Sequence, residues 1–454
     1  MPSFSSTPMI CHLLPYQMDI SSLFSSFADL SGAILFDSGK PASSFGHIDI
    51  FSALPAKTLS IQEGQYRLTE GESSESLNDI QSVINLLNSN WHTETSDLPF
   101  TSGWMGHANY ELLHYLALGQ GTPEKNSAMP VFWAGYYEWA IINDHKAQTC
   151  QLVYSESLSK ETLNTINACL AKTIGNQPYK AASHFTPLID EAAYTTGFNQ
   201  IKHHIKEGDC YQVNYTFPFE ADFYGNPYAA YRKLRETSPN PFMAYLNGGD
   251  YQILSISPER FLSANQQTVT TKPIKGTIKR DPTNAINDKA LAHTLKASEK
   301  NRAENVMIVD LLRNDLSIMA KPHSVNVDTL CEIESFPSVH HLVSTISAEL
   351  VEDKTIWDLF FAAFPGGSIT GTPKKRVCEI INQLEFHPRG TYCGSLFYAS
   401  NNGRFDSNIA IRTLTCMAGK ITANVGGGIV ADSTCENEYD ECEVKIRHLL
   451  NCLQ

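Results

Sequence analysis

The sequence predicts an α/β protein of the α+β type, in which strands and helices are mixed without a regular βαβ alternation. The chain has 454 residues and is 42% hydrophobic, which is enough apolar material for a substantial buried core. Strand-like and helix-like segments follow each other irregularly, and this favours α+β or a mixed sheet over a dinucleotide-binding unit. Length alone would allow about three domains of ~150 residues, although large enzymes of this class often keep one continuous sheet core.

A change of texture divides the chain into residues 1–180 and residues 181–454. The first region is expected to hold several alternating strands, such as Ala33–Phe36 and Val131–Ile142, and a helix near Leu77–Asn88. The polar, turn-forming stretch at 175–187 is the best candidate for a linker or a surface crossing.

The second region contains longer helices and strands with clear ends. The final helix is expected to start at Ser433 as its N-cap and to bury leucine and isoleucine side chains at core-facing spacing. The other predicted elements are a helix at Tyr194–Glu207, strands at Gln252–Ser257 and Thr268–Lys272, a turn at 273–277, a helix at Glu299–Arg313, and a strand at Ile421–Val425 running into Gly426–Gly428.

Composition excludes several classes of protein. A formal net charge of −14, from 34 Lys and Arg against 48 Asp and Glu, argues against a nucleic-acid binder. No apolar run approaches the ~18 residues needed to span a bilayer, and the first residues lack the basic segment of a secretory signal. The 11 cysteines are scattered without zinc-site spacing. We therefore expect no membrane contact and a cytoplasmic location.

Charged side chains on the final helix suggest a ligand site. Glu438, Glu441 and Lys445 have the spacing i, i+3 and i+7, which places them on one helix face. Two carboxylates one turn apart can hold Mg²⁺ through oxygen ligands and water, and the lysine could bind a substrate carboxylate. An earlier predicted helix, which carries Glu304, Asp310 and Asp315, could supply the further carboxylate that such an ion needs, although structural ion pairs are the better explanation for Asp310 and Asp315 individually. The same pattern also fits a solvated acidic surface.

Two glycine-rich segments do not predict nucleotide binding. Gly426–Gly428 with Ala431 formally fits G-x-G-x-x-A, but too few residues follow for a βαβ unit. The segment that starts at Gly366 lacks the ending of a P-loop. We expect the triple glycine to bring backbone N–H groups close to a ligand carboxylate beside the last helix.

Eight segments together carry a resemblance to the chorismate-binding enzyme family. They lie in the family's order and are densest in the second region. The segments are GDCYQVN (208–214), LSISPERF (254–261), KPIKGT (272–277), RAENVMIVDLLRND (302–315), VHHLVSTI (339–346), FPGGSITGTPK (364–374), IRTL (411–414) and GGGIVADS…ENEYDECEVK (426–445).

The resemblance implies one large unit with two antiparallel sheets sandwiched together and helices outside. It also implies a role for each matched residue. Mg²⁺ would be held by Glu304 and Glu441 with Glu438 nearby; Arg412, Lys445, Gly427 and Gly428 would hold the carboxylates of chorismate; His341 and Thr370 would line the ring; and Glu259 would be the general acid beside the leaving hydroxyl.

One residue separates the branches of this family. Where Lys275 stands, anthranilate synthases usually have alanine, whereas aminodeoxychorismate synthases of this type have lysine. The resemblance therefore implies covalent chemistry, in which the Lys275 amine attacks ring carbon 2 and ammonia then enters at carbon 4. An ordinary lysine is only about 0.1% neutral near pH ~7.4, so the pKa of Lys275 must be lowered, while the pKa of Glu259 must be raised.

The ammonia is expected to come from a separate glutaminase subunit, forming a heterodimer. A fused amidotransferase would need roughly 190 further residues, which this sequence does not contain. Anthranilate synthase component I is the main alternative, isochorismate or salicylate synthase a more distant one, and a catalytically silent scaffold subunit a third. The segments around Ser38 and around Pro241 and Phe242 partly match a tryptophan pocket of feedback-inhibited relatives, and packed core residues explain them equally well.

Overall fold

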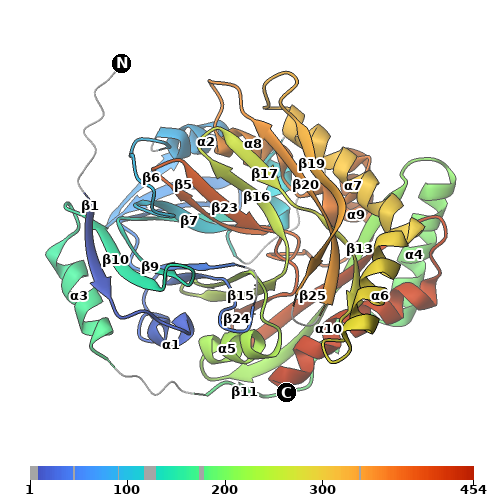
Figure 1. The fold of residues 1–454 in the computed structure, drawn as a ribbon, viewed down its shortest axis with the longest axis horizontal. Helices are drawn as coiled ribbons and strands as arrows, with labels where there is room; N and C mark the ends of the chain where they lie inside the picture. The colour runs from blue at the N-terminus through green and yellow to red at the C-terminus, as the bar shows by residue number, and fades with distance from the viewer. Residues whose placement is uncertain (1–8, 44–45, 90, 117–128, 173–177, 337–338) are drawn as a thin grey trace.

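Two large antiparallel sheets, with helices on their outer sides, form the molecule in a computed structural model (Figure 1). The structure describes residues 9–454 apart from 44–45, 90, 117–128, 173–177 and 337–338. This arrangement confirms the fold class that the sequence and the family resemblance predict.

In the described part of the chain, the first sheet contains 13 strands. Strands of residues 9–155 occupy one side of its order and strands of residues 180–429 occupy the other, so the sheet spans the whole chain. The strands are β1 (Met9–Leu14), β10 (Thr149–Ser155), β9 (Trp139–Asp144), β3 (Ile48–Ser52), β2 (Ile34–Asp37), β14 (Phe242–Asn247), β15 (Tyr251–Ser257), β24 (Thr413–Met417), β25 (Lys420–Ile429), β13 (Gln212–Tyr224) and β11 (Lys180–Ala181), with β12 (Thr186–Pro187) and β21 (Gly371–Thr372) also paired to β13.

The second sheet contains 12 strands among the described residues and is likewise shared by both regions. Its strands are β18 (Ile274–Lys279), β20 (Val339–Glu349), β17 (Thr268–Thr271), β16 (Arg260–Asn265), β23 (Arg404–Asn408), β22 (Ser395–Ser400), β7 (Gly103–Ala108), β8 (Phe132–Tyr137), β4 (Lys57–Gln62), β5 (Gln65–Glu70) and β6 (Ser73–Leu77), with β19 (Asn326–Ser335) paired to β20.

Helices cover the outer faces, and two of them matter most for the site. Helix α7 packs on β20, and α10 packs on β25. The helices are α1 (Ile20–Phe24), α2 (Ile80–Ser89), α3 (Lys160–Leu170), α4 (Glu191–Lys206), α5 (Pro227–Thr237), α6 (Ala285–Ala297), α7 (Glu299–Ser317), α8 (Ile356–Ala363), α9 (Lys374–Leu384) and α10 (Cys435–Leu453), with 3-10 turns η1 (Tyr110–Tyr115) and η3 (Gly367–Ile369).

Two buried clusters stabilise this arrangement. One lies between the sheets and joins Ile34 and Ile253 of the first sheet to Met105 and Leu396 of the second. The larger cluster joins the sheets to the helices, including Ile308 of α7. Within the described residues, no helix combines the length and apolar character needed to cross a bilayer.

The structure corrects several local expectations. The predicted turn at 273–277 belongs largely to strand β18, and the triple glycine lies inside β25 rather than after it. The segment Val131–Ile142 contains two strands, β8 and β9. Helix α10 has Thr434 as its N-cap instead of Ser433. Of the linker expected at 175–187, residues 175–177 lie outside the described residues, and the remainder includes β11 and β12.

Candidate active site

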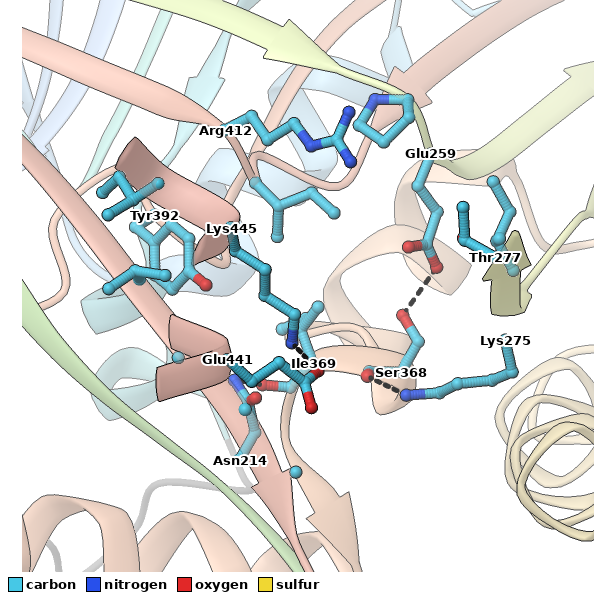
Figure 2. A pocket seen from close by; sticks show the side chains of 18 of the residues that line it. Asn214, Glu259, Lys275, Thr277, Ser368, Ile369, Tyr392, Arg412, Glu441 and Lys445 are labelled. Atoms are coloured by element: carbon cyan, nitrogen blue, oxygen red, sulfur yellow. Dashed lines mark hydrogen bonds and ion pairs between the residues drawn. The ribbon is translucent and has the colours of Figure 1, made fainter. Parts of the chain in front are cut away.

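A cavity of about 490 Å³ lies where β18, α7, η3, β25 and α10 meet (Figure 2). We call it the first cavity. Nearly every residue selected from the sequence lies in its wall, although the segments are far apart in the chain. These residues are Glu259, Lys275, Glu304, His341, Arg412, Gly427, Gly428, Glu438, Glu441 and Lys445.

A β-bulge places Lys275 in the wall. Strand β18 pairs with β20 at Ile274 opposite Val343 and again at Thr277 opposite His341, so β18 carries one extra residue between these pairs. Gly276 has φ +87° there, and a Cβ atom at this position would lie 2.9 Å from the side chain of Asn301. Glycine therefore permits the bulge, and the bulge directs the neighbouring Lys275 into the wall of the first cavity.

Glu259 faces the same cavity from the end of β15. The side chain is only 7% exposed, and its Oε1 accepts a hydrogen bond from the Ser368 hydroxyl at 2.9 Å. The Nζ of Lys275 donates to the carbonyl oxygen of Ser368 at 3.4 Å (Figure 2). The Glu259 carboxyl and the Lys275 amine therefore both hydrogen-bond to Ser368, the first to its hydroxyl and the second to its carbonyl oxygen.

Burial shifts both groups away from their ordinary charge states. Burial raises the pKa of Glu259 to about 7, against the opposing effects of Lys275 and of hydrogen bonds from Ser368 and the Ile274 backbone. Burial also lowers the pKa of Lys275, and the positive charge of Lys445 acts in the same direction. These are the directions that a general acid and a nucleophilic amine require.

Lys272, which is close to Lys275 in the sequence, lines a different cavity and pairs there with Glu334 at 3.2 Å. Among the described residues, neither Lys275 nor Arg412 forms an ion pair with a carboxylate. Arg412 thus presents an unpaired positive charge to the first cavity, which suits an anionic ligand.

His341 is held in the wall by Thr277. The Nδ1 atom of His341 lies 2.7 Å from the Thr277 hydroxyl, and the ring is 5% exposed. Burial, with the nearby charges of Arg412 and His340, lowers the pKa of His341 to about 4. The imidazole is therefore neutral near pH 7 and can contribute a hydrogen bond, but not a positive charge.

The carboxylates of α7 and α10 were predicted to hold Mg²⁺. Glu441 forms an ion pair with Lys445 at 2.7 Å, and Glu438 accepts a hydrogen bond from Ser433 at 2.6 Å. In the described part of the chain, no three His, Cys, Asp or Glu side chains are grouped closely enough to hold a metal by themselves. Two carboxylates from opposite walls, completed by water and substrate oxygens, fit the usual surroundings of Mg²⁺.

Glu304 and Glu441 are the pair that meets this requirement best. Both line the first cavity, Glu304 from α7 and Glu441 from α10, and both exert an electrostatic effect on Lys275. Helix α7 is fixed behind Glu304 because the Ser344 hydroxyl donates to Asn305 Oδ1 at 2.5 Å. The donor set is therefore all oxygen, as a hard cation prefers.

The triple glycine, Gly426–Gly428, lies in strand β25 and lines the first cavity. In β25, Gly427 is paired with Tyr215 of β13. A Cβ atom at Gly427 would lie 2.9 Å from Glu438 Oε2, so a side chain there would displace α10 or fill the cavity. Glycine is therefore needed here because β25, α10 and the space for the ligand lie too close together for a side chain.

Thr370 differs from expectation, because it does not line the first cavity. It is fully buried, and its hydroxyl donates to the carbonyl oxygens of Gly366 and Gly367 at 3.2 and 3.3 Å. Asp310 and Asp315, in contrast, form the structural ion pairs that we expected, with Arg313 and Lys374 respectively.

Sequence reasoning did not select several residues of the wall. They are polar side chains in strands and turns, where single residues give little signal outside their spatial context. Gln212, Asn214, Thr277, Ser368 and Tyr392 all line the first cavity.

A second cavity of about 570 Å³ lies on the other side of Pro258 and Ile274, which line both cavities. Ser38, Pro241 and Phe242 converge on its wall, although Ser38 is about 200 residues from the others. The three residues assigned to a tryptophan pocket thus share one space, and their ligand remains a proposal.

The first cavity is that of an enzyme for a small anionic substrate, since a buried acid and a desolvated amine both contact Ser368 in its wall, and the unpaired guanidinium of Arg412 lines the same space. The profile of the chorismate binding enzyme family matches residues 32–451. With that match, the chain belongs to the chorismate-binding enzyme family.

Individual relatives agree with this assignment. The aminodeoxychorismate synthase component 1 of Escherichia coli K12 is 38% identical over 459 residues, which cover 99% of each chain. The protein of the same name from Salmonella typhimurium is 37% identical over 451 residues, which cover 97% of each chain. A crystal structure of anthranilate synthase component I from Streptococcus pneumoniae has a TM-score of 0.78 at 30% identity, covering 89% of this chain and 92% of that one. The resemblance read from the sequence is confirmed.

Proposed function

We propose that this protein aminates chorismate at ring carbon 4, giving 4-amino-4-deoxychorismate for para-aminobenzoate and folate synthesis. The observation that carries the proposal is Lys275, whose amine reaches the wall of the first cavity beside Glu259. Anthranilate synthases usually have alanine at this position, and an alanine could not supply a nucleophile.

The first step joins the lysine to the ring. The neutral Lys275 nitrogen bonds to carbon 2 as the ring double bonds shift, and the carbon 4 hydroxyl leaves as water with a proton from Glu259. In the second step ammonia bonds to carbon 4, the double bonds shift back, and the carbon–lysine bond breaks. The entering nitrogen returns a proton to the Glu259 carboxylate, so the enzyme is restored.

The remaining residues hold the substrate in place. Arg412 and Lys445 would bind its carboxylates, Gly427 and Gly428 would let the molecule approach the strand backbone, and His341 would hydrogen-bond near the ring. Mg²⁺, held by Glu304 and Glu441, would neutralise substrate negative charge when bound. The cytoplasm is the location that fits this role.

The ammonia would come from a separate glutaminase subunit. The name "component 1" of the relatives from Escherichia coli and Salmonella typhimurium supports a second component for those proteins. Free ammonium should replace the partner less efficiently, because a docked subunit would deliver ammonia at high local concentration.

The product decides between this function and the main alternative, anthranilate synthase component I, which the likeness to the Streptococcus pneumoniae structure favours. Purified protein is incubated with chorismate, Mg²⁺ and ammonium, and the product mass and released pyruvate are measured. We expect an amino product that keeps its enolpyruvyl group, without pyruvate. Anthranilate with one pyruvate per turnover would overturn the proposal.

A further inference from the structure

Ser368 stands between the two reactive groups, although it belongs to neither of the roles discussed above. Its hydroxyl donates to Glu259 Oε1 at 2.9 Å, and its carbonyl oxygen accepts from Lys275 Nζ at 3.4 Å. Figure 2 shows both contacts, one from the side chain and one from the backbone. The residue is 8% exposed and lines the first cavity.

The turn that carries Ser368 is fixed by its neighbours. The buried Thr370 hydroxyl holds the carbonyl groups at the start of the turn, and Asn214 Nδ2 donates to the Ile369 carbonyl oxygen at 2.9 Å. A Cβ atom at Gly367 would lie 2.6 Å from Leu311 of α7. The turn is therefore packed too closely to move freely, and Ser368 presents two contacts from a rigid support.

We propose that Ser368 is a positioning residue, which fixes the Glu259 carboxyl with its hydroxyl and the Lys275 amine with its carbonyl. One residue then sets the separation of the acid and the nucleophile, so that both can address the same ring. This inference rests on the proposed amination, because it takes Glu259 as the acid and Lys275 as the nucleophile.

The hydroxyl contact also disfavours one position for the acidic proton. A carboxyl oxygen that already accepts a hydrogen bond is the weaker place for a proton, so the Ser368 contact disfavours protonation of Glu259 at Oε1. In the first step this proton passes to the leaving oxygen as the lysine–carbon bond forms. Ser368 keeps its own proton and donates more strongly to the carboxylate that results.

The test compares Ser368→Ala with Ser368→Thr, which retains a hydroxyl. Ser52→Ala is the matched control, because Ser52 is buried and donates one hydrogen bond, to Trp139 O at 2.7 Å, away from both cavities. For Ser368→Ala we expect kcat to fall about 10- to 100-fold, the range of one hydrogen bond to a charged group, with KM for chorismate within about twofold of wild type. Unchanged kcat, or a change confined to KM, would overturn the proposal.

The pH profile separates positioning from mere packing. The Ser368 hydrogen bond lowers the pKa of Glu259, so its removal should raise that pKa and move the alkaline limb of kcat/KM upward. If its larger side chain fits, Ser368→Thr should retain the wild-type kcat and the wild-type position of the alkaline limb of kcat/KM. An unshifted limb in Ser368→Ala would contradict a contact between the hydroxyl and the acid.

A double-mutant cycle decides the case even if the threonine variant is misfolded. In a Glu259→Gln background, Ser368→Ala should cost less than about twofold, because its partner is already altered. Equal losses in both backgrounds would show that Ser368 acts elsewhere. The titration of Glu259 by infrared difference spectroscopy, assigned with Glu259→Gln, tests the contact in the free protein. It remains decisive if the wild type releases anthranilate, so failure of the inference and failure of the proposed function are distinguishable.

Discussion

The two cavities share a wall but differ in how their cations are paired. In the second cavity Arg260 pairs with Asp406 at 2.7 Å and Lys272 pairs with Glu334 at 3.2 Å. In the first cavity Lys445 pairs with Glu441, but the described part of the chain gives Lys275 no carboxylate within ion-pair distance. An unpaired polar group in a buried wall costs free energy, and such groups are typical of ligand-binding and catalytic sites.

The chain builds this difference from neighbouring residues. Glu259 lines the first cavity and Arg260 lines the second, because successive side chains of extended backbone point to opposite sides. Lys275 and Lys272 likewise line different cavities, the first and the second respectively. Charge type alone therefore does not identify the reactive residues; the face on which they lie does.

The largest expected effect comes from exchanging the two lysines for alanine. Lys275→Ala should lower kcat/KM for amination by at least about 100-fold, which is about 2.7 kcal/mol, because the nucleophile is removed. Lys272→Ala should change it less than about threefold, since a half-exposed ion pair contributes little. Steady-state kinetics with ammonium measures kcat/KM of both variants. Equal losses of kcat/KM would contradict the view that Lys275 takes part in the reaction and Lys272 does not.

The second effect concerns the metal. Glu304→Gln should raise the Mg²⁺ concentration for half-maximal activity by about 10- to 100-fold, as the loss of a group that supports a metal typically does. Glu334→Gln, in the wall of the second cavity, is the control and should leave this concentration unchanged. Calorimetric titration of Mg²⁺ in the presence of chorismate is an independent measurement. A normal Mg²⁺ requirement in Glu304→Gln would exclude it as a ligand.

The third effect is a shift of the pH profile. A general acid acts when protonated, so kcat/KM should fall as the pH rises through about 7, the pKa to which burial raises Glu259. The positive charge of Lys275 lowers that pKa, so the residual activity of Lys275→Ala should fall at a higher pH. Arg260→Gln, whose guanidinium faces the second cavity, should not move the limb. If the alkaline limb of kcat/KM moved to lower pH in Lys275→Ala, the titrating group would be one other than Glu259.

The sequence predicted much of the first cavity because its residues carry a local pattern. The helical spacing of Glu438, Glu441 and Lys445 correctly placed all three on the cavity side of α10. Lys275 was found through the family resemblance, since a lysine beside a glycine has no distinctive spacing. Ser368 was missed because its role depends on a contact with a residue 109 positions away, which no local pattern records.

The elements were predicted less evenly than the site. Helices such as α7 were found because their apolar residues recur over many turns. Strand β18 was taken for a turn, since proline and glycine are typical of turns, and here they instead accompany the bulge. The sheet order could not be derived, because each sheet joins strands that are far apart in the chain, β2 to β14 in one and β7 to β22 in the other, and no local pattern records such pairing.

The smallest expected effect concerns the second cavity, which we propose binds tryptophan or a similar amino acid. Its wall offers the ring of Phe242, stacked 4.8 Å from the guanidinium of Arg260, and the hydroxyl of Ser38. Bound tryptophan should raise the Tm, and at about 10 times Kd the stabilisation would be about 1.4 kcal/mol. Thermal denaturation with and without tryptophan measures this effect.

Phe242→Ala should remove the tryptophan shift while kcat/KM stays within about threefold of wild type, because the changed side chain faces away from the first cavity. Arginine and alanine serve as ligands without an aromatic ring and should give no shift. A shift that survives in Phe242→Ala would place the amino acid elsewhere. Pro258 and Ile274 belong to both walls, so they are the residues that connect the proposed tryptophan site directly to the first cavity.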